Sequence, residues 1–173
     1  MRKKILFIFA PLLFLACNFL FPTTQQDKNP LPTPLEPASD QSTSTFTIVR
    51  IHKQDGDLLT QLTAETQKAK KLNQNPFIEF DATWCPPCKA IEASLKAKDA
   101  ITMKAFEGVY LIRADVDEWG WGDGKTFKFE AIPIYYQLDD SGKSTGVTID
   151  GSAWNEDIPK NFAPVLDKFF HSQ

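Results

Sequence analysis

Two cysteines three positions apart, Cys85 and Cys88, are the feature that most constrains this chain. They end an apolar, aromatic-rich run beginning at Phe77, which is typical of a buried strand, and a helical pattern starts behind them. Residues at i and i+3 lie on one face of a helix, so the two sulfurs can close a small disulfide ring. The first cysteine would lie at the helix N-terminus, where unpaired amide hydrogens and the helix dipole favour a thiolate. This placement predicts thiol–disulfide exchange.

The cysteine count argues against a structural disulfide framework. The chain has three cysteines, and the third, Cys17, lies in the N-terminal leader. The pair is therefore either a redox-active dithiol or half of a metal site. Zinc takes four ligands, and the two histidines, His52 and His171, are far from the pair in sequence. We expect no metal and no other cofactor, and a Cu(I) metallochaperone using the same two thiolates is the alternative from another class.

The composition favours one globular domain that does not bind nucleic acid. Hydrophobic residues make up 42% of the chain and include 14 phenylalanines, enough for the core of a domain of about 125 residues. The net charge is −3, and no stretch concentrates lysine and arginine into a basic patch.

The first 45 residues indicate a leader and a tether. A basic start and an apolar stretch predict a secretory signal or membrane anchor over 1–21. Phe14-Leu15-Ala16-Cys17 resembles a bacterial lipobox, which predicts lipidation of Cys17; a cleaved soluble form and an uncleaved anchor are the alternatives. Residues 22–45 hold five prolines among Ser, Thr and Gln, which predicts an extended linker.

From Phe46 onward, strand and helix patterns alternate and a hairpin comes late, which predicts an α/β fold with a mixed sheet. Besides the run at Phe77, strands are predicted at 46–51, 109–116, 132–138 and 145–149. Helices are predicted at 58–72, 86–98, 99–107, 125–130 and 156–170, with 117–124 a loop.

Residues 46–170 resemble the thioredoxin superfamily. Within it they are most similar to extracytoplasmic domains such as the C-terminal domain of the bacterial thiol:disulfide interchange protein. The resemblance rests on Phe80-x-Ala82-x-Trp84-Cys85-Pro86-Pro87-Cys88-Lys89, Glu92, Asp115-Val116-Asp117 and Ala131-Ile132-Pro133. It implies a thioredoxin fold, a central mixed sheet flanked by helices, for a domain at 46–173.

The resemblance also implies roles for the residues around the pair. Cys85 would be the attacking nucleophile, and Cys88, less exposed, the resolving thiol. Pro133 matches the family's cis-proline, which faces the cysteines; an ordinary trans proline is the alternative. Trp84 would shape the approach to Cys85, and Ile132 would offer its backbone to a substrate on a more apolar rim.

Glu79 is the third predicted catalytic residue. It lies six residues before Cys85, where the family often has a buried aspartate. Burial would raise its pKa and let it shuttle a proton for Cys88, whereas a partly exposed carboxylate is the alternative. Arg113 matches a position where the family often has a lysine, and pairing with it would pull the pKa of Glu79 back down.

Two further features qualify the chemistry. Pro86 and Pro87 lack N–H groups, which leaves the amides of Cys88 and Lys89 to stabilise a thiolate and predicts a more reducing pair. Trp119 and Trp121 lie in a glycine-rich loop, where they form either a docking patch or ordinary loop packing.

Together these features predict a membrane-tethered thiol–disulfide oxidoreductase outside the bacterial cytoplasm, on the periplasmic face or cell surface. We expect it to reduce protein disulfides with electrons from a membrane redox partner. Oxidation or isomerisation is the alternative direction, because direction depends on the redox potential. An interaction module with incidental cysteines is a further alternative.

Overall fold

The computed structural model describes residues 46–172. The expected leader (1–21), the expected linker (22–45) and Cys17 lie outside the described residues, so these assignments stay predictions. Among the helices of residues 46–172, none has the length and apolar character needed to cross a bilayer.

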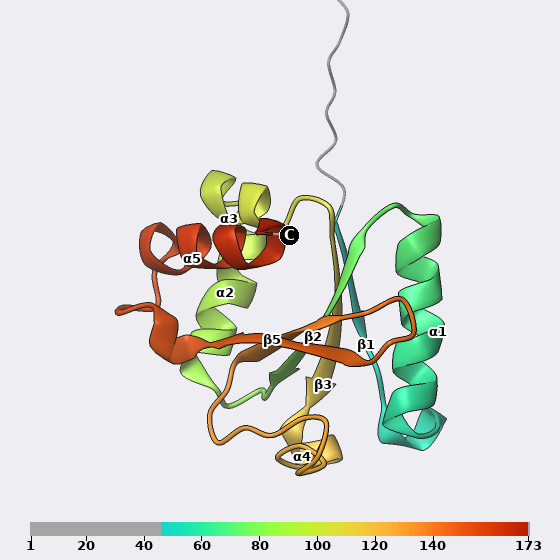
Figure 1. Ribbon diagram of the computed structural model, residues 1–173. Helices are drawn as coiled ribbons and strands as arrows, with labels where there is room; N and C mark the ends of the chain where they lie inside the picture. Colours follow the sequence, from blue (N-terminus) through green and yellow to red (C-terminus); the bar gives the residue numbers. More distant parts are fainter. Residues whose placement is uncertain (1–45, 173) are drawn as a thin grey trace, which may run out of the picture. The chain divides into compact units, whose positions relative to one another are not determined.

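A five-stranded mixed sheet forms the centre of the described chain (Figure 1). In spatial order its strands are β1 (Thr47–Arg50), β3 (Val109–Asp115), β2 (Asn75–Asp81), β4 (Ile134–Leu138) and β5 (Ser144–Asp150). The first three are parallel, β4 is antiparallel to β2, and β5 is antiparallel to β4. Every residue of β3 before Asp115 is buried, as expected for a parallel strand covered on both faces. The predicted mixed sheet is confirmed.

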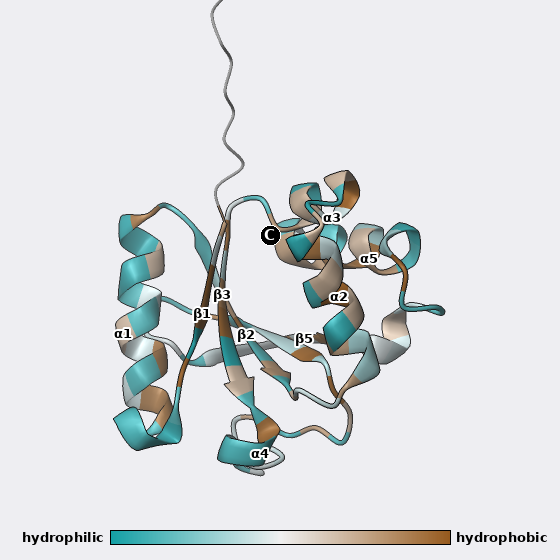
Figure 2. Cartoon of the chain, turned by 180° about the vertical axis from the view of Figure 1, so that it is seen from behind, coloured by the Kyte–Doolittle hydropathy of each residue, from teal (hydrophilic) through white to brown (hydrophobic). Residues whose placement is uncertain are grey.

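Helices cover both faces of this sheet. On one side lies α1 (Leu58–Lys71), and on the other α2 (Pro86–Lys96), α3 (Ala100–Ala105) and α5 (Pro159–His171) lie together (Figure 1). Strands β1 and β3 between them are largely hydrophobic, whereas α1 is mostly hydrophilic on its outside (Figure 2). The remaining short elements are η1 (Lys53–Asp55), α4 (Val116–Trp119) and η2 (Gly151–Ala153).

Each face of the sheet has its own hydrophobic cluster. Leu62 of α1 belongs to the same cluster as Phe80 of β2. On the opposite face, Phe77 packs its ring edge-on against Phe170 of α5, with the ring centroids 4.8 Å apart. Burying one such side chain contributes about 1.5–3 kcal/mol, so these clusters hold the fold together without a covalent staple.

Helix α1 begins and ends at residues suited to those positions. Asp57 is its N-cap and accepts a hydrogen bond from the backbone N–H of Thr60 at 2.9 Å. Its last turn carries three lysines, which the negative end of the helix dipole favours. Leu72, the last residue of the helix predicted over 58–72, lies outside the helix as its C-cap and is 55% exposed.

Two predictions between β3 and β4 are wrong. Residues 117–119, predicted as part of a loop, belong to helix α4, and residues 125–130 are not helical. One carboxylate oxygen of Asp123 accepts three backbone N–H groups, from residues 125, 126 and 127, at 2.7–2.9 Å. Gly122 also forms an isolated bridge with Lys128. These bonds fold the segment as a compact loop, because Asp side chains compete with helix formation for backbone partners.

Candidate active site

Cys85 and Cys88 lie where β2 leads into α2, and they form a disulfide. Cys85 is the N-cap of the helix, and its Sγ accepts the backbone N–H of Cys88 at 3.3 Å. Pro86 follows at the first helical position, where a missing N–H costs nothing. The N–H of Lys89 instead donates to the carbonyl oxygen of Cys85 at 3.1 Å. Of the two amides considered for the sulfur, only that of Cys88 bonds to it.

Both cysteines are buried, and the expected order of exposure is wrong. Cys85 is 1% exposed and Cys88 is 6% exposed, whereas we expected the second to be the less exposed. The reason lies in the chain segment before β4, because the Sγ of Cys85 is 3.7 Å from the carbonyl oxygen of Ile132. In this disulfide form, the segment covers the first sulfur.

The covering segment contains the proline singled out in the sequence. The peptide bond between Ile132 and Pro133 is cis, as the resemblance implied. The carbonyl oxygen of Pro133 accepts the backbone N–H of Gly151 at 3.0 Å, which ties the segment to the residues after β5. Two segments 47 residues apart, at Cys85 and Ile132, thus meet at the disulfide.

The tryptophans near the disulfide have different surroundings. Trp84 is 51% exposed, and its indole N–H donates to a carboxylate oxygen of Asp117 at 3.0 Å. Trp119 is partly buried, and its indole N–H donates to the carbonyl oxygen of Ile51 at 3.2 Å. Trp121 is 48% exposed. Of the two tryptophans predicted from the sequence to lie in a loop, Trp119 therefore packs within the fold, and Trp121 lies at the surface.

Glu79 lies in a row of polar side chains that crosses the sheet. In register it is the neighbour of Arg113 on β3 and of Tyr135 on β4, and Arg113 is the neighbour of Arg50 on β1. Arg113 Nε donates to one carboxylate oxygen of Glu79 at 2.7 Å, and the Tyr135 hydroxyl donates to the other at 2.8 Å. Glu79 is 0% exposed, so the alternative of a partly exposed carboxylate is excluded.

Asp81, two residues after Glu79, links the two arginines. Arg50 donates to both of its carboxylate oxygens, at 2.8 and 2.6 Å, and Arg113 Nε lies 4.0 Å from one of them. Like charges facing each other on neighbouring strands destabilise a sheet, and Asp81 offsets that repulsion. The result is a chain of alternating charges from Arg50, whose side chain is 34% exposed, to the buried Glu79.

This arrangement makes Glu79 a weaker acid than an exposed glutamate. Burial raises the pKa of Glu79 above its ordinary value of 4.5, Arg113 and Tyr135 oppose the rise, and Asp81 adds to it. For Arg113, burial alone would lower the pKa, but Glu79 and Tyr135 raise it above its ordinary value. Arg113 therefore keeps its positive charge, and the carboxyl of Glu79 can hold a proton at a higher pH than usual.

Glu79 lies on the sheet face that α2 covers. Alternate residues of a strand point the same way, so Glu79 shares its face with Phe77. Phe77 belongs to the same hydrophobic cluster as Ile91 of α2, the helix that carries Cys88. The buried acid therefore lies under the helix of the resolving thiol.

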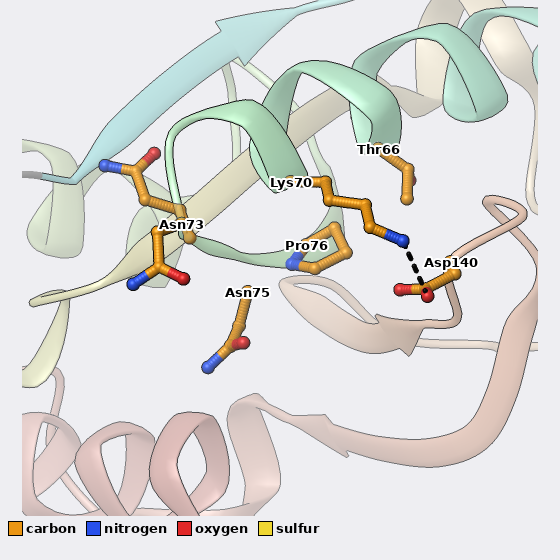
Figure 3. A pocket seen from close by; sticks show the side chains of 7 residues that line it. Thr66, Lys70, Asn73, Asn75, Pro76 and Asp140 are labelled. Atoms are coloured by element: carbon orange, nitrogen blue, oxygen red, sulfur yellow. Dashed lines mark hydrogen bonds and ion pairs between the residues drawn. The ribbon is translucent and has the colours of Figure 1, made fainter.

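The described residues offer no second centre of comparable chemistry. Within 46–172, no group of three or more His, Cys, Asp or Glu is arranged to hold a metal ion. A polar pocket of about 320 Å³ lies at the start of β2, the end opposite Cys85, and Lys70 and Asp140 form an ion pair of 3.2 Å across it (Figure 3). No cysteine lines this pocket.

The thioredoxin family model matches residues 59–163, a range that includes the disulfide, the buried acid and the cis-proline. The chain belongs to the thioredoxin family. Its sheet and helices are the thioredoxin fold that the resemblance implied. The family and the disulfide at the N-terminus of α2 together identify the chemistry of the site as thiol–disulfide exchange.

Individual relatives cover only parts of this thioredoxin-family chain. It is 30% identical over 100 residues to an H-type thioredoxin of Oryza sativa subsp. indica, covering 58% of this chain and 74% of the relative. It is 33% identical over 73 residues to thioredoxin H4 of Arabidopsis thaliana, covering 42% of this chain and 58% of that one. The chain thus spans little more than half of the Arabidopsis relative.

Solved structures give distant matches. A mutant thioredoxin from Halobacterium salinarum NRC-1 is 17% identical, with a TM-score of 0.46, covering 73% of this chain and 89% of that one. Thioredoxin from Trichomonas vaginalis is 22% identical, with a TM-score of 0.39, covering 61% of this chain and 86% of that one.

The structure brings together most of the residues predicted for the site. Cys85, Cys88 and Ile132 meet at the disulfide, with Pro133 and Trp84 next to them in the chain. Their roles with a substrate stay predictions, as does the proton transfer by Glu79. The sequence did not reveal the parts played by Asp81, Arg50, Tyr135 and the Asp117–Trp84 hydrogen bond. Asp81 could have been found by strand alternation from Glu79, but Tyr135 resembles any aromatic strand residue in sequence.

Proposed function

We propose that this protein is a membrane-tethered reductase of protein disulfides outside the bacterial cytoplasm. The observation that carries the proposal is the Cys85–Cys88 disulfide at the N-terminus of α2, next to the segment before β4. Membership of the thioredoxin family supports protein disulfides as the substrate class. A membrane redox partner would supply the electrons.

The reaction begins with the dithiol form. The Cys85 thiolate attacks one sulfur of the client disulfide, a mixed disulfide forms, and the client's other sulfur leaves as a thiolate and takes up a proton. The Cys88 thiolate then attacks the Cys85 sulfur, the Cys85–Cys88 disulfide forms, and the client's second sulfur leaves as a thiolate and takes up a proton. The client gains two electrons and two protons, and the cysteine pair loses them.

Glu79 takes the proton from Cys88 as that thiol attacks. Its burial and raised pKa support this role, since a base works best when its pKa approaches the working pH. Arg113 and Tyr135 each bond one of its oxygens, which holds the carboxyl in a single orientation. Trp84, Ile132 and Pro133 would contact the client chain around the attacked disulfide.

The pair acts in the reducing direction. One amide, that of Cys88, donates to the Cys85 sulfur, and the two prolines that follow supply none. Fewer donors stabilise the thiolate less, which favours the disulfide form and a lower potential. Equilibration with glutathione buffers, read by alkylation and mass spectrometry, tests this. We expect a potential well below that of the strongest disulfide oxidants, which is about −120 mV; a value close to theirs would overturn the direction.

The cellular location rests on the leader sequence. A secretory-type stretch, a lipobox-like Cys17 and a proline-rich tether support a lipid-anchored protein whose domain extends from the membrane. The intact mass of the protein extracted from bacterial membranes tests this part. Acyl groups on Cys17 are expected. An unmodified Cys17 would contradict the lipid anchor but would leave the proposed disulfide reduction unaffected.

Turnover distinguishes the proposed activity from metal carriage. With insulin as substrate and dithiothreitol as electron donor, the parent should catalyse reduction, and Cys85→Ser and Cys88→Ser should not. Leu72→Ala is the matched control, because this exposed leucine lies at the opposite end of the sheet. Stoichiometric Cu(I) binding with no turnover would favour the metallochaperone instead.

A further inference from the structure

Two exposed tryptophans lie side by side next to the disulfide. The ring centroids of Trp84 and Trp121 are 6.4 Å apart, with 37° between the ring planes. They are 51% and 48% exposed, and their side chains come from segments separated by β3 and the helices before it. Trp84 directly precedes Cys85, so this Trp84–Trp121 patch adjoins the reacting sulfur.

Local packing supports the loop that carries Trp121. Gly122 has a φ of 81°, and a Cβ added there would collide with the carbonyl oxygen of Phe127. Trp121 also packs on Phe129, with the ring centroids 6.0 Å apart, and Phe129 packs on Phe80 of the core at 4.6 Å. Aromatic side chains held in this way bind at a low entropic cost, because little motion remains to be lost.

One carboxylate lies at the edge of the patch, in a stretch of sequence with a net negative charge. The carboxylate of Asp117 lies 3.0 Å from the indole nitrogen of Trp84, at the edge of its ring. The sequence from Asp115 to Glu130, which includes Trp121, contains five carboxylates and two lysines. The face of an indole ring attracts cations such as the guanidinium of arginine and the ammonium of lysine. A nearby carboxylate adds to this attraction. Two exposed indoles beside the Asp117 carboxylate therefore fit a basic side chain.

We infer that the Trp84–Trp121 patch docks an arginine or lysine next to the reacting cysteine of a client polypeptide. The inference rests on the proposed function, since it names the client class of the same disulfide. The cation stacks on an indole face and pairs with Asp117, while the client cysteine lies at Cys85. Clients with basic residues beside their disulfide are then reduced faster than clients with neutral or acidic ones.

Three peptides that differ at one position test the inference. Each has the same intramolecular disulfide, with Arg, Gln or Glu next to the cysteine attacked. The fully reduced protein is mixed with each peptide, and its oxidation in a single turnover is followed by acid quenching and alkylation, so no electron donor is needed. We expect the order Arg, Gln, Glu, with Arg ahead of Gln by roughly three- to tenfold, the size of a partly exposed cation–π contact.

The readout for the variants is the ratio of the Arg and Gln rates, which cancels any effect common to both peptides. Trp121→Ala should bring this ratio close to one, and Trp121→Phe should restore part of it. Leu72→Ala, a similarly exposed apolar residue far from the disulfide, should keep the parental ratio. High ionic strength should lower the ratio in the parent, because the contact is partly electrostatic.

Three other results would contradict the inference. An unchanged ratio in Trp121→Ala, equal slowing of both peptides, or a parental preference for Gln or Glu would overturn the patch as a docking surface. The proposed function fails in a different way: the reduced parent would then be oxidised neither by these peptides nor by the small neutral hydroxyethyl disulfide.

Discussion

The two sides of the disulfide are built on different principles. Below it, under α2, Glu79 and Arg113 are buried neighbours on adjacent strands, and each is fixed by the register of the sheet. Beside it, Trp84 and Trp121 are half exposed and meet through a loop. We therefore expect the buried side to affect folding and the proposed proton transfer, and the exposed side to affect the proposed binding of clients. Mutations on the two sides should separate these effects.

The largest expected change in stability comes from breaking the buried ion pair. Arg113→Met leaves the carboxylate of Glu79 without its cation, and losing one partner of a buried pair costs about 3–5 kcal/mol. The free energy of unfolding in urea measures this loss. Arg50→Met is the control in the same network, and it should cost clearly less because its side chain is 34% exposed. Equal losses would show that burial does not distinguish the two arginines.

Replacing the buried acid should change how stability depends on pH. The folded-state pKa of Glu79 is raised above 4.5, so the folded protein holds this proton more tightly than the unfolded chain. Its contribution to stability is complete below 4.5 and is lost as the pH rises through the raised pKa. Glu79→Gln cannot lose a proton and should therefore gain stability relative to the parent as the pH rises. Urea unfolding between about pH 4 and pH 8 measures the difference.

The same variant should also slow the second step of the reaction. Loss of a general base typically costs about 10²–10⁴-fold, and here the loss should fall on release of the mixed disulfide rather than on its formation. Rapid quenching of the reduced Glu79→Gln variant with a peptide disulfide should show the mixed species accumulating. Formation slowed as much as release would contradict the assignment of Glu79 to Cys88.

A smaller pH effect is expected far from the disulfide, at His171. Its two ring nitrogens lie 2.8 Å from the carbonyl oxygens of Asp167 and Glu107, and a carbonyl oxygen can only accept. Burial alone would lower the pKa of His171, but these carbonyls and the Asp167 carboxylate raise it above 6.5. This stabilisation, below about 1 kcal/mol because solvent screens the partly exposed ring, is present below 6.5 and is lost as the pH rises through the raised pKa. An NMR titration of the ring checks the direction, and a pKa at or below 6.5 would contradict it.

A small effect on stability is expected for the exposed patch. Trp121→Ala removes a ring that is 48% exposed and should lower the free energy of unfolding by about 1 kcal/mol, because the ring also packs on Phe129. Calorimetry of the Trp121→Ala and Arg113→Met variants under the same conditions compares the two losses of stability directly. A loss comparable to that of Arg113→Met would mean that Trp121 supports the fold, and the distinction between the two sides would fail.

The sequence predicted what local patterns determine. The strand before Cys85, the helix beginning at Pro86 and the mixed sheet all follow from periodicity and turn residues. The cis bond at Pro133 followed from the resemblance. The buried position of Glu79 was implied by the resemblance, with a partly exposed carboxylate as the alternative, and its pairing with Arg113 was considered there.

Contacts between segments that are distant in the chain could not be predicted from the sequence. The charged row depends on the lateral order β1-β3-β2-β4, which places Arg50 and Tyr135 on either side of β2 and β3. The loop after α4 depends on which backbone amides Asp123 captures, and its composition alone indicated a helix. The exposure of Cys85 depends on the covering carbonyl of Ile132, which comes from 47 residues later in the chain.

Trapping of the mixed disulfide tests the central claim most directly. The reduced Cys88→Ser variant should form a stable covalent adduct with a client disulfide through Cys85, seen as an added mass that dithiothreitol removes. The reduced Cys85→Ser variant should form far less of this adduct, because Cys88 lies one turn into the helix. Adducts formed equally through Cys88, or none in either variant, would contradict the account.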